Sequence, residues 1–169
     1  MKEITIKIPE GKKAMVTFVE EDSLPVTERI KTFYDAMKAL GNNHPLVLQY
    51  RGTSAAYEGD PMVKDLIAYL KIRIIVTALN EGWEPKFIEG ETRYFPWFYF
   101  YTKEQYARLD DEAKRCCSLC DTGKFVCCTA SYAALSATSH LGSRLCFKTS
   151  ALAIYAGEQF IKEYLDFVC

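Results

Sequence analysis

Hydrophobic residues recur with two different periods in different segments of this chain, and each period predicts a different kind of secondary structure. Near the start, Ile4, Ile6 and Ile8 alternate with polar residues ahead of the turn-forming residues 9–11. Residues 14–19 then resume an extended pattern. Because an alternation of period two is typical of a half-buried strand, this segment is predicted to form an N-terminal hairpin.

Helical spacing follows the hairpin. Apolar residues recur at intervals of three and four between Ile30 and Leu40. Thr27 is placed to cap such a helix at its start, and Gly41 is placed to end it. Residues 45–57 are compatible with a short helix, although the Gly-Thr-Ser run inside them weakens the pattern.

A longer apolar stripe marks the predicted central helix. Asp60 and Pro61 provide a cap and a favourable first helical residue, and Gly82 provides an end. Leu66 and Leu79 are the first and last of seven apolar residues that share a broad face at 3.6 residues per turn. A helix with so wide an apolar face is expected to lie at the centre of the core.

The most aromatic stretch of the chain is RYFPWFYFY, residues 93–101, in which seven of nine side chains are aromatic. Such a run favours a strand buried on both faces. Residues 102–105 have the spacing of a capping box and predict a short helix. The acids at 110–112 predict a second helix start ahead of residues 113–116.

The end of the chain returns to helical spacing. From Ser150 onward, apolar residues predict a C-terminal amphipathic helix despite Gly157. A chain of 169 residues, 49% of them hydrophobic, is long enough to bury one core and too short for two. The sequence therefore predicts a single α+β domain over residues 1–169. Its parts are an N-terminal hairpin and helices, an aromatic-rich central strand with further strands within residues 93–147, and the C-terminal helix.

Charge and targeting signals narrow the expected partners and location. The 21 Lys and Arg residues nearly balance 22 Asp and Glu residues, so neither nucleic acid nor an anionic membrane surface is an expected partner. The N-terminus has no apolar run of seven or more residues, so neither a signal peptide nor a membrane span is predicted there. An odd count of 7 cysteines without such a signal predicts reduced thiols inside a cell.

The segment CCSLCDTGKFVCC, residues 116–128, holds five of the cysteines and raises the question of a zinc site. Cys117 and Cys120 have the spacing of one half of such a site. Cys127 and Cys128 are adjacent, and neighbours on a strand point to opposite faces, so they do not form the other half together. Further candidate ligands are Cys116, His140 and Cys146. The favoured interpretation is a helix end that runs into a buried strand, with no metal and no cofactor.

No complete catalytic motif is present, and a non-enzyme is predicted. Glycine-rich phosphate loops, the G-x-S-x-G elbow and H-E-x-x-H are all absent from the sequence. The two histidines, His44 and His140, lack an identifiable group to orient a His–Cys pair. The aromatic run also suits a stacking platform for single-stranded nucleic acid, but only Arg93 and Lys103 flank it, where a basic groove is needed.

The region around residues 125–147 has an unusual composition. These 23 residues contain no Lys, Glu, Gln, Met or Trp, whereas those five types make up 37 of the 169 residues of the chain. By proportion, about five of them are expected in this region. A tightly packed strand pair rich in Ala and Ser is one explanation.

Four stretches also carry a resemblance: PVTERIKTFYDA, LIAYLKIRIIVTALNEGWEPKF, RYFPWFYFYTKEQ and GSRLCFKTSALAIYAGEQF. Together they resemble an uncharacterised family found in gut Bacteroidetes and their phages or prophages, and the similarity covers most of the chain. No activity comes with that family. The segment 127–145, which ends in Gly-Ser-Arg-Leu, resembles the variable region of target proteins diversified by retroelements. Such regions are often presented on a C-type-lectin-like fold.

The second resemblance accounts for the composition and implies a function. Adenine-directed mutagenesis of AAY codons yields Tyr, Ser, Cys, Ala, Thr, His and Leu, but never the five absent types. The resemblance implies a non-enzymatic binding protein, intracellular or virion-associated, with a diversifiable surface at residues 127–142 for an unknown protein or cell-surface ligand. The implied ligand-facing residues are Tyr132, Leu135, Ser136, Thr138, His140 and Leu141. The alternatives are a phage structural or assembly protein and a zinc-stabilised regulator, and a homo-oligomer stays open.

Overall fold

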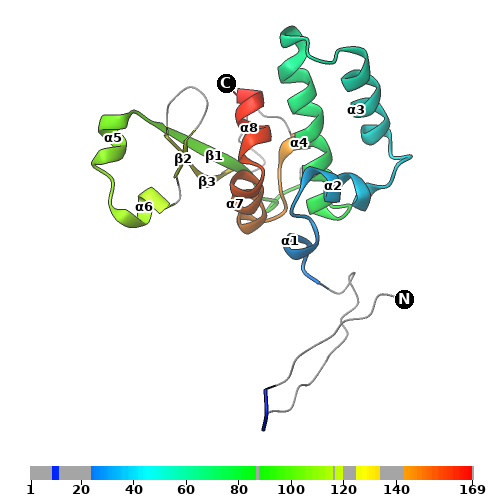
Figure 1. Ribbon diagram of the computed structural model, residues 1–169. Helices are drawn as coiled ribbons and strands as arrows, with labels where there is room; N and C mark the ends of the chain where they lie inside the picture. Colours follow the sequence, from blue (N-terminus) through cyan, green and yellow to red (C-terminus); the bar gives the residue numbers. More distant parts are fainter. Residues whose placement is uncertain are drawn as a thin grey trace.

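The computed structural model describes residues 9–11, 24–86, 88–115, 117–119, 125–133 and 143–168 (Figure 1). It confirms an α+β fold, and the predicted N-terminal hairpin lies outside the described residues. The helices are α1 (Val26–Arg29), α2 (Phe33–Leu40), α3 (Pro45–Ala56), α4 (Lys64–Asn80), α5 (Lys103–Ala107), α6 (Asp111–Arg115), α7 (Ser150–Gln159) and α8 (Ile161–Val168). The short 3-10 helices are η2 (Pro61–Val63) and η3 (Ser143–Leu145), and the strands are β1 (Arg93–Tyr101), β2 (Cys117–Leu119) and β3 (Phe125–Ala133).

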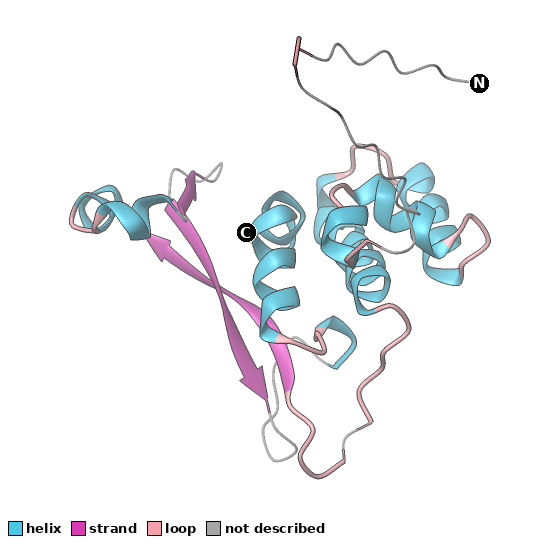
Figure 2. Ribbon diagram, turned by 90° about the horizontal axis from the view of Figure 1, so that it is seen from below, coloured by secondary structure: helices cyan, strands magenta, loops and turns pink. Residues whose placement is uncertain are grey.

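The described elements form two regions. Helices α2, α3, α4, α7 and α8 pack together, and we call this group the helical body (Figure 1). The sheet lies against α7 and extends away from the body to α5 and α6 at its far end (Figures 1 and 2). We call the sheet with α5 and α6 the arm. No helix of the described residues is long and apolar enough to cross a membrane.

Helix α4 is the centre of the body, as the sequence predicts. Ile72, Ile74 and Ile75 have no exposed surface, although they point in different directions around the helix. The reason is that α2 and α3 pack on α4, and so does α8. Burial of each such side chain stabilises the fold by about 1.5–3 kcal/mol.

The capping residues set the ends of the predicted helices, and one prediction is wrong. Thr27 does not start a continuous helix to Leu40, because Ile30 is extended between α1 and α2. Thr32 caps α2 instead, where its hydroxyl accepts from the Asp35 N–H and the Asp35 carboxylate accepts from the Thr32 N–H. The capping box therefore starts α2 after Thr32, although apolar residues keep helical spacing from Ile30 onward. Gly41, with a φ of 86°, ends α2 as predicted.

The other helices follow their local signals with smaller corrections. Residues 45–57, left open by the sequence, form α3, because His44 accepts the Leu46 N–H at the start of the helix. Asp60 caps the turn ahead of α4 through the Met62 N–H. The single C-terminal helix is instead α7 and α8, with Phe160 between them.

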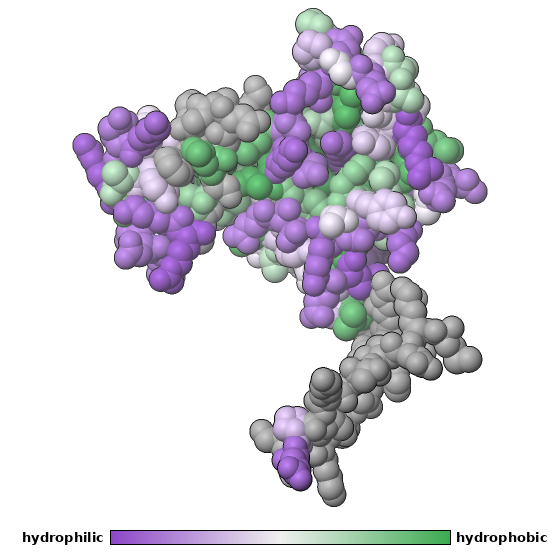
Figure 3. Space-filling view, in the orientation of Figure 1, coloured by the Kyte–Doolittle hydropathy of each residue, from purple (hydrophilic) through white to green (hydrophobic). Residues whose placement is uncertain are grey.

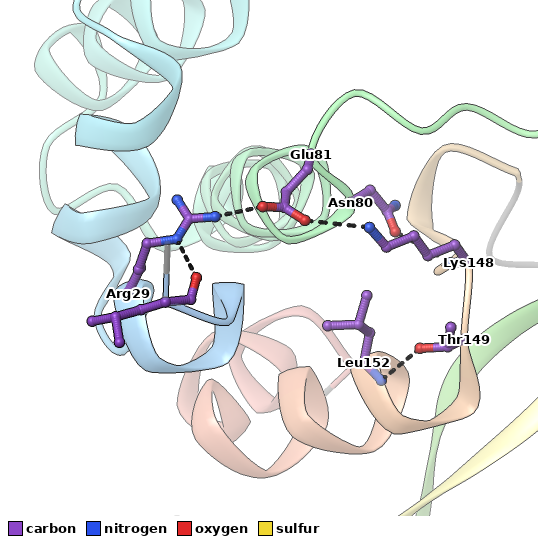
Figure 4. Close-up of polar contacts among 7 residues, drawn as sticks. Arg29, Asn80, Glu81, Lys148, Thr149 and Leu152 are labelled. Carbon is purple, nitrogen blue, oxygen red and sulfur yellow. Dashed lines mark hydrogen bonds and ion pairs between the residues drawn. The ribbon is translucent and has the colours of Figure 1, made fainter. Parts of the chain in front are cut away.

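A polar cluster joins the C-terminal end of α4 to distant parts of the chain (Figure 4). The side chain of buried Asn80 donates to the Cys146 carbonyl at 2.8 Å and accepts from the Lys148 N–H at 3.2 Å. Glu81 forms ion pairs with Arg29 and with Lys148. Since buried polar groups need partners, Asn80 fixes residues 146–148 against α4.

The sheet is antiparallel in the order β1-β3-β2. Helix α7 packs on one of its faces, where Gly157 approaches so closely that an added Cβ would lie 2.1 Å from Cys128 Sγ. We call this the helix-facing side. Figure 2 shows α7 and α8 on one side of the sheet and no described helix against the other. The prediction that β1 is buried on both faces is therefore wrong, because the described helices cover one face only.

Candidate functional site: the open face of the sheet

The uncovered side of the sheet is the candidate functional site, and we call it the open face. Side chains alternate along a strand, and the register places Trp97 beside Thr129 and Tyr99 beside Cys127. Strand β2 continues the same rows, with Cys117 opposite Cys127. The open face consists of Trp97, Tyr99, Tyr101, Cys117, Leu119, Cys127 and Thr129.

The open face exposes large apolar side chains. The exposed fraction is 50% for Trp97, 49% for Tyr99 and 65% for Leu119. The Tyr99 and Tyr101 rings stack with their centroids 6.4 Å apart. Figure 3 shows hydrophilic side chains over α5 and α6, at the far end of the arm. A contiguous apolar patch with a polar rim is typical of a protein interaction site.

The exposed patch does not extend over the whole of β1, because other residues bury the first part of this side of the strand. At the start of the strand, Phe95 is buried in a small cluster with Cys146 and Trp83. Two residues further along the same side, Trp97 is half exposed. The change occurs within one strand of nearly uniform hydrophobicity, so it reflects what packs on the strand and not the strand's own sequence.

The electrostatics of the open face favour an uncharged partner. Among its described residues there is no Lys, Arg, Asp or Glu. Partial desolvation, with smaller contributions from Cys127 and Cys117, raises the pKa of Tyr101, so its hydroxyl is neutral at neutral pH. Platforms that stack nucleic-acid bases lie in positively charged grooves. The chemistry therefore suits an apolar protein surface better than a nucleic acid.

Comparison with known proteins returned no match. Neither a protein-family model, nor a curated protein, nor a solved structure matches this chain. The resemblances drawn from the sequence therefore stay predictions.

The cysteines divide between the two sides of the sheet. Cys127 and Cys128 point to opposite sides, as predicted, since Cys128 is buried against Gly157 and Cys127 is partly exposed. The predicted helix end is wrong at Cys117, which lies in β2, because pairing with β3 outweighs the short helical pattern. Cys116 and Cys120 lie outside the described residues.

The reactivity of these thiols follows their burial. Burial raises the pKa of Cys128 to about 12 and the pKa of Cys146 to about 11. Both thiols are therefore protonated and inert at neutral pH. Cys117 and Cys127 are opposite each other and reduced. Among the described residues, no group of three His, Cys, Asp or Glu is placed to hold a metal ion.

The ligand-facing residues predicted from the sequence do not coincide with the open face. Tyr132 is 72% exposed near the end of β3, opposite Tyr94. The alternation along β3 puts Tyr132 on the same side as buried Cys128, away from Trp97. The other predicted positions, Leu135, Ser136, Thr138, His140 and Leu141, lie outside the described residues. The sequence missed the open face because every position of β1 beyond Arg93 is apolar, so no period shows which side is covered.

A pocket also lies in the helical body. It has a volume of about 360 Å³, lies beside the start of α4 and includes Asp166 of α8. Lys64 and Asp166 at its wall form an ion pair at 2.9 Å. Asp60 in its wall accepts from the Met62 N–H, and Lys71 lies over the Phe33 ring. The pocket therefore defines no ligand chemistry as clear as that of the open face.

Proposed function

We propose that this chain is a non-enzymatic binding protein whose open face contacts a partner. The observation that carries the proposal is the pair of half-exposed rings, Trp97 and Tyr99, on a strand side that the described helices leave uncovered. Trp and Tyr are the residues most often found at the energetic centre of protein interfaces. The lack of charge on this face fits a partner with an apolar surface.

The scaffold behind the open face supports this role. The sheet is fixed to the helical body by the close packing of Gly157 against Cys128 and by the paired backbones of Tyr94 and Phe147. A surface held on paired strands loses little conformational freedom when it binds. The rings therefore present a preorganised contact area.

The setting that we propose comes from the sequence resemblances. The similarity to a gut Bacteroidetes and phage family supports a protein of a phage or another mobile element. The similarity to retroelement-diversified targets supports a second, diversifiable surface at residues 127–142, whose described member Tyr132 is strongly exposed. The partner is then another protein or a cell-surface ligand, and an assembly role in a phage particle uses the same open face.

A zinc-stabilised regulator is the second candidate, because Cys117 and Cys127 lie opposite each other on neighbouring strands. Zinc requires two further ligands. Elemental analysis of protein purified without added metal or chelator tests this candidate. About one zinc per chain supports it, and metal-free folded protein rejects it.

Site-specific photo-crosslinking tests the proposed binding role. Tyr99 is replaced by benzoylphenylalanine in protein expressed in bacterial cells, and Tyr57 on the helical body is replaced in a matched control. Both tyrosines are 49% exposed, so they differ in location and not in accessibility. The proposal predicts a discrete covalent adduct from position 99 that is absent from position 57. Equal adducts from both positions, or none from position 99, contradict it.

A further inference from the structure

The outer edge of β1 is a second feature of the arm, distinct from the open face. Tyr94 exchanges two backbone hydrogen bonds with Phe147, at 3.1 and 2.8 Å, on the side away from β3. Backbone groups alternate in direction along a strand, so Phe98 and Phe100 also point their N–H and C=O groups to this outer edge. Pro96 has the same direction, which agrees with the preference of proline for edge positions.

This edge has no protection against pairing. Beyond Tyr94, no described residue forms a backbone hydrogen bond with the outer edge of β1. Residues 96–101 include no charged side chain, although natural edge strands usually carry a lysine or another charge that blocks association. An uncharged, unpaired edge is therefore available to another strand.

We propose that β1 pairs antiparallel with β1 of a second copy of this chain, with Tyr99 at the two-fold axis. In this register Phe98 lies opposite Phe100 of the second copy, and the two reciprocal pairs use every outward N–H and C=O group of both residues. Pro96, which has no N–H, then lies opposite Thr102, whose N–H already donates to Gln105 Oε1 at 2.8 Å. The two positions that cannot donate meet at the ends of the ladder.

Other registers leave backbone carbonyl groups of this edge without a hydrogen-bond donor. With Phe98 at the axis, the Phe100 carbonyl lies opposite Pro96 and finds no donor. With Phe100 at the axis, the Phe98 carbonyl lies opposite the occupied Thr102 N–H. The edge is thus complementary to itself in one preferred register, which is the reason for choosing a second copy as the occupant.

The side chains also fit this pairing. Trp97 lies opposite Tyr101 of the second copy, and Tyr99 lies opposite its own counterpart, so aromatic pairs form and no like charges meet. The two three-stranded sheets become one continuous sheet, and both open faces lie on the same side of it. This inference rests on the proposed function and deepens it, since pairing doubles the binding surface.

The contact is short, and the dimer is expected to be weak. A partly exposed aromatic side chain contributes up to roughly 100 Å² to a contact, whereas a standard interface buries about 800 Å² on each partner. The ladder and its aromatic pairs therefore lie at the lower end of the range for specific complexes. A dissociation constant on the order of 10 μM is expected.

Sedimentation velocity of the full chain tests the proposed dimer, with charged residues introduced at position 99 on the two-fold axis. The wild type is expected to pass from monomer to dimer between about 1 and about 200 μM. Tyr99→Lys and Tyr99→Glu are each expected to weaken the dimer at least about tenfold, because each places like charges opposite each other. An equimolar mixture of the two variants is expected to dimerise again. Tyr57→Lys, with the same exposure in the wild type, leaves the dimer unchanged.

A second variant separates edge pairing from contact between open faces. Phe100→Pro removes an outward N–H that the described chain does not use, whereas Phe100→Ala keeps it. Edge pairing predicts that only the proline variant loses the dimer, with circular dichroism as the check on folding. A monomeric wild type, a dimer that survives Phe100→Pro, or no recovery in the mixture overturns the inference. If the wild type is monomeric while position 99 still forms adducts with another protein, the dimer fails and the binding role stands.

Discussion

The helical body and the arm contain similar apolar side chains, which are buried in the body and partly exposed in the arm. In the body, α4 is covered on several sides, so Ile75 and its neighbours are fully buried and stabilise the fold. In the arm, the described helices cover β1 on one side only, and Trp97 and Tyr99 on the other side remain half exposed. Hydrophobicity alone therefore does not separate a core residue from an interaction residue. What separates them is whether another element of the same chain packs on them.

Truncation of one side chain in each region is expected to change stability by very different amounts. Ile75→Ala is expected to lower the free energy of unfolding by about 3–4 kcal/mol, because it leaves a cavity in a closely packed core. Tyr99→Ala is expected to lower it by less than about 1 kcal/mol, since half of its surface already faces solvent. Urea denaturation of dilute samples measures both changes. Equal losses would show that the open face is part of the folding core.

The junction between the regions is tested at Gly157. A Cβ at this position would lie 2.1 Å from Cys128 Sγ and 3.0 Å from Pro96 Cβ, so Gly157→Ala is expected to cost about 3 kcal/mol of stability. Gly52, inside α3, has no atom within 4 Å of an added Cβ. Gly52→Ala is therefore expected to stabilise the protein by about 0.5–1 kcal/mol.

A double variant identifies the cause of the Gly157 effect. Cys128→Ala removes the sulfur atom that the new methyl group meets, so the combined Gly157→Ala and Cys128→Ala variant is expected to recover part of the loss. Thermal unfolding of the four proteins gives the coupling energy. If the two losses simply add, α7 does not approach the sheet as the structure shows.

The polar cluster of the body offers a third, smaller test. Asn80→Ala is expected to cost about 2 kcal/mol, because the buried Cys146 carbonyl and the Lys148 N–H both lose their partner. Asn42 accepts a hydrogen bond from Arg51 at the surface, and Asn42→Ala is expected to change stability by less than about 0.5 kcal/mol. Chemical denaturation at one pH compares the two variants. A loss as small at Asn80 as at Asn42 would contradict the account of the cluster.

Buried Cys128, on the helix-facing side of the sheet, predicts a pH dependence of stability. Burial raises the pKa of Cys128 from 9.0 to about 12. The unfolded chain loses this proton near its ordinary pKa, while the folded chain keeps it, so stability is fully present below that pKa and falls as the pH rises toward about 12. The slope for one thiol approaches about 1.4 kcal/mol per pH unit.

Denaturation at about pH 8 and about pH 10 measures this loss, which is expected to be about 1–2 kcal/mol for one thiol. Cys128→Ala serves as the control, because it removes the contribution of that thiol to the pH slope. An unchanged slope in Cys128→Ala would mean that Cys128 is not the group that loses its proton.

Local signals account for what the sequence predicted well. The centre of α4 and the capping box that opens α5 depend on residues within a few positions of each other, so the pattern alone was sufficient. The boundary between α1 and α2 was missed because Thr27 and Thr32 are both suitable capping residues in the sequence, whereas in the structure Asp35 completes a capping box with Thr32 and Thr27 lies inside α1.

Long-range contacts account for what the sequence did not predict. Strand β2 is short and exists through its pairing with β3, which no local pattern signals. Trp97 is exposed because α7 packs on the other side of the sheet, while Trp83 and Cys146 bury Phe95, two residues earlier in the strand. The candidate site therefore required the structure, although its residues were visible in the sequence as an aromatic run.

Binding of a partner at the open face is tested by photo-crosslinking at Tyr99, with Tyr57 as the matched control. Such binding predicts a discrete adduct between position 99 and another protein, and no such adduct from position 57; an adduct of twice the chain mass also arises from edge pairing of β1. Absence of any adduct at position 99, or the same adducts at both positions, would contradict it.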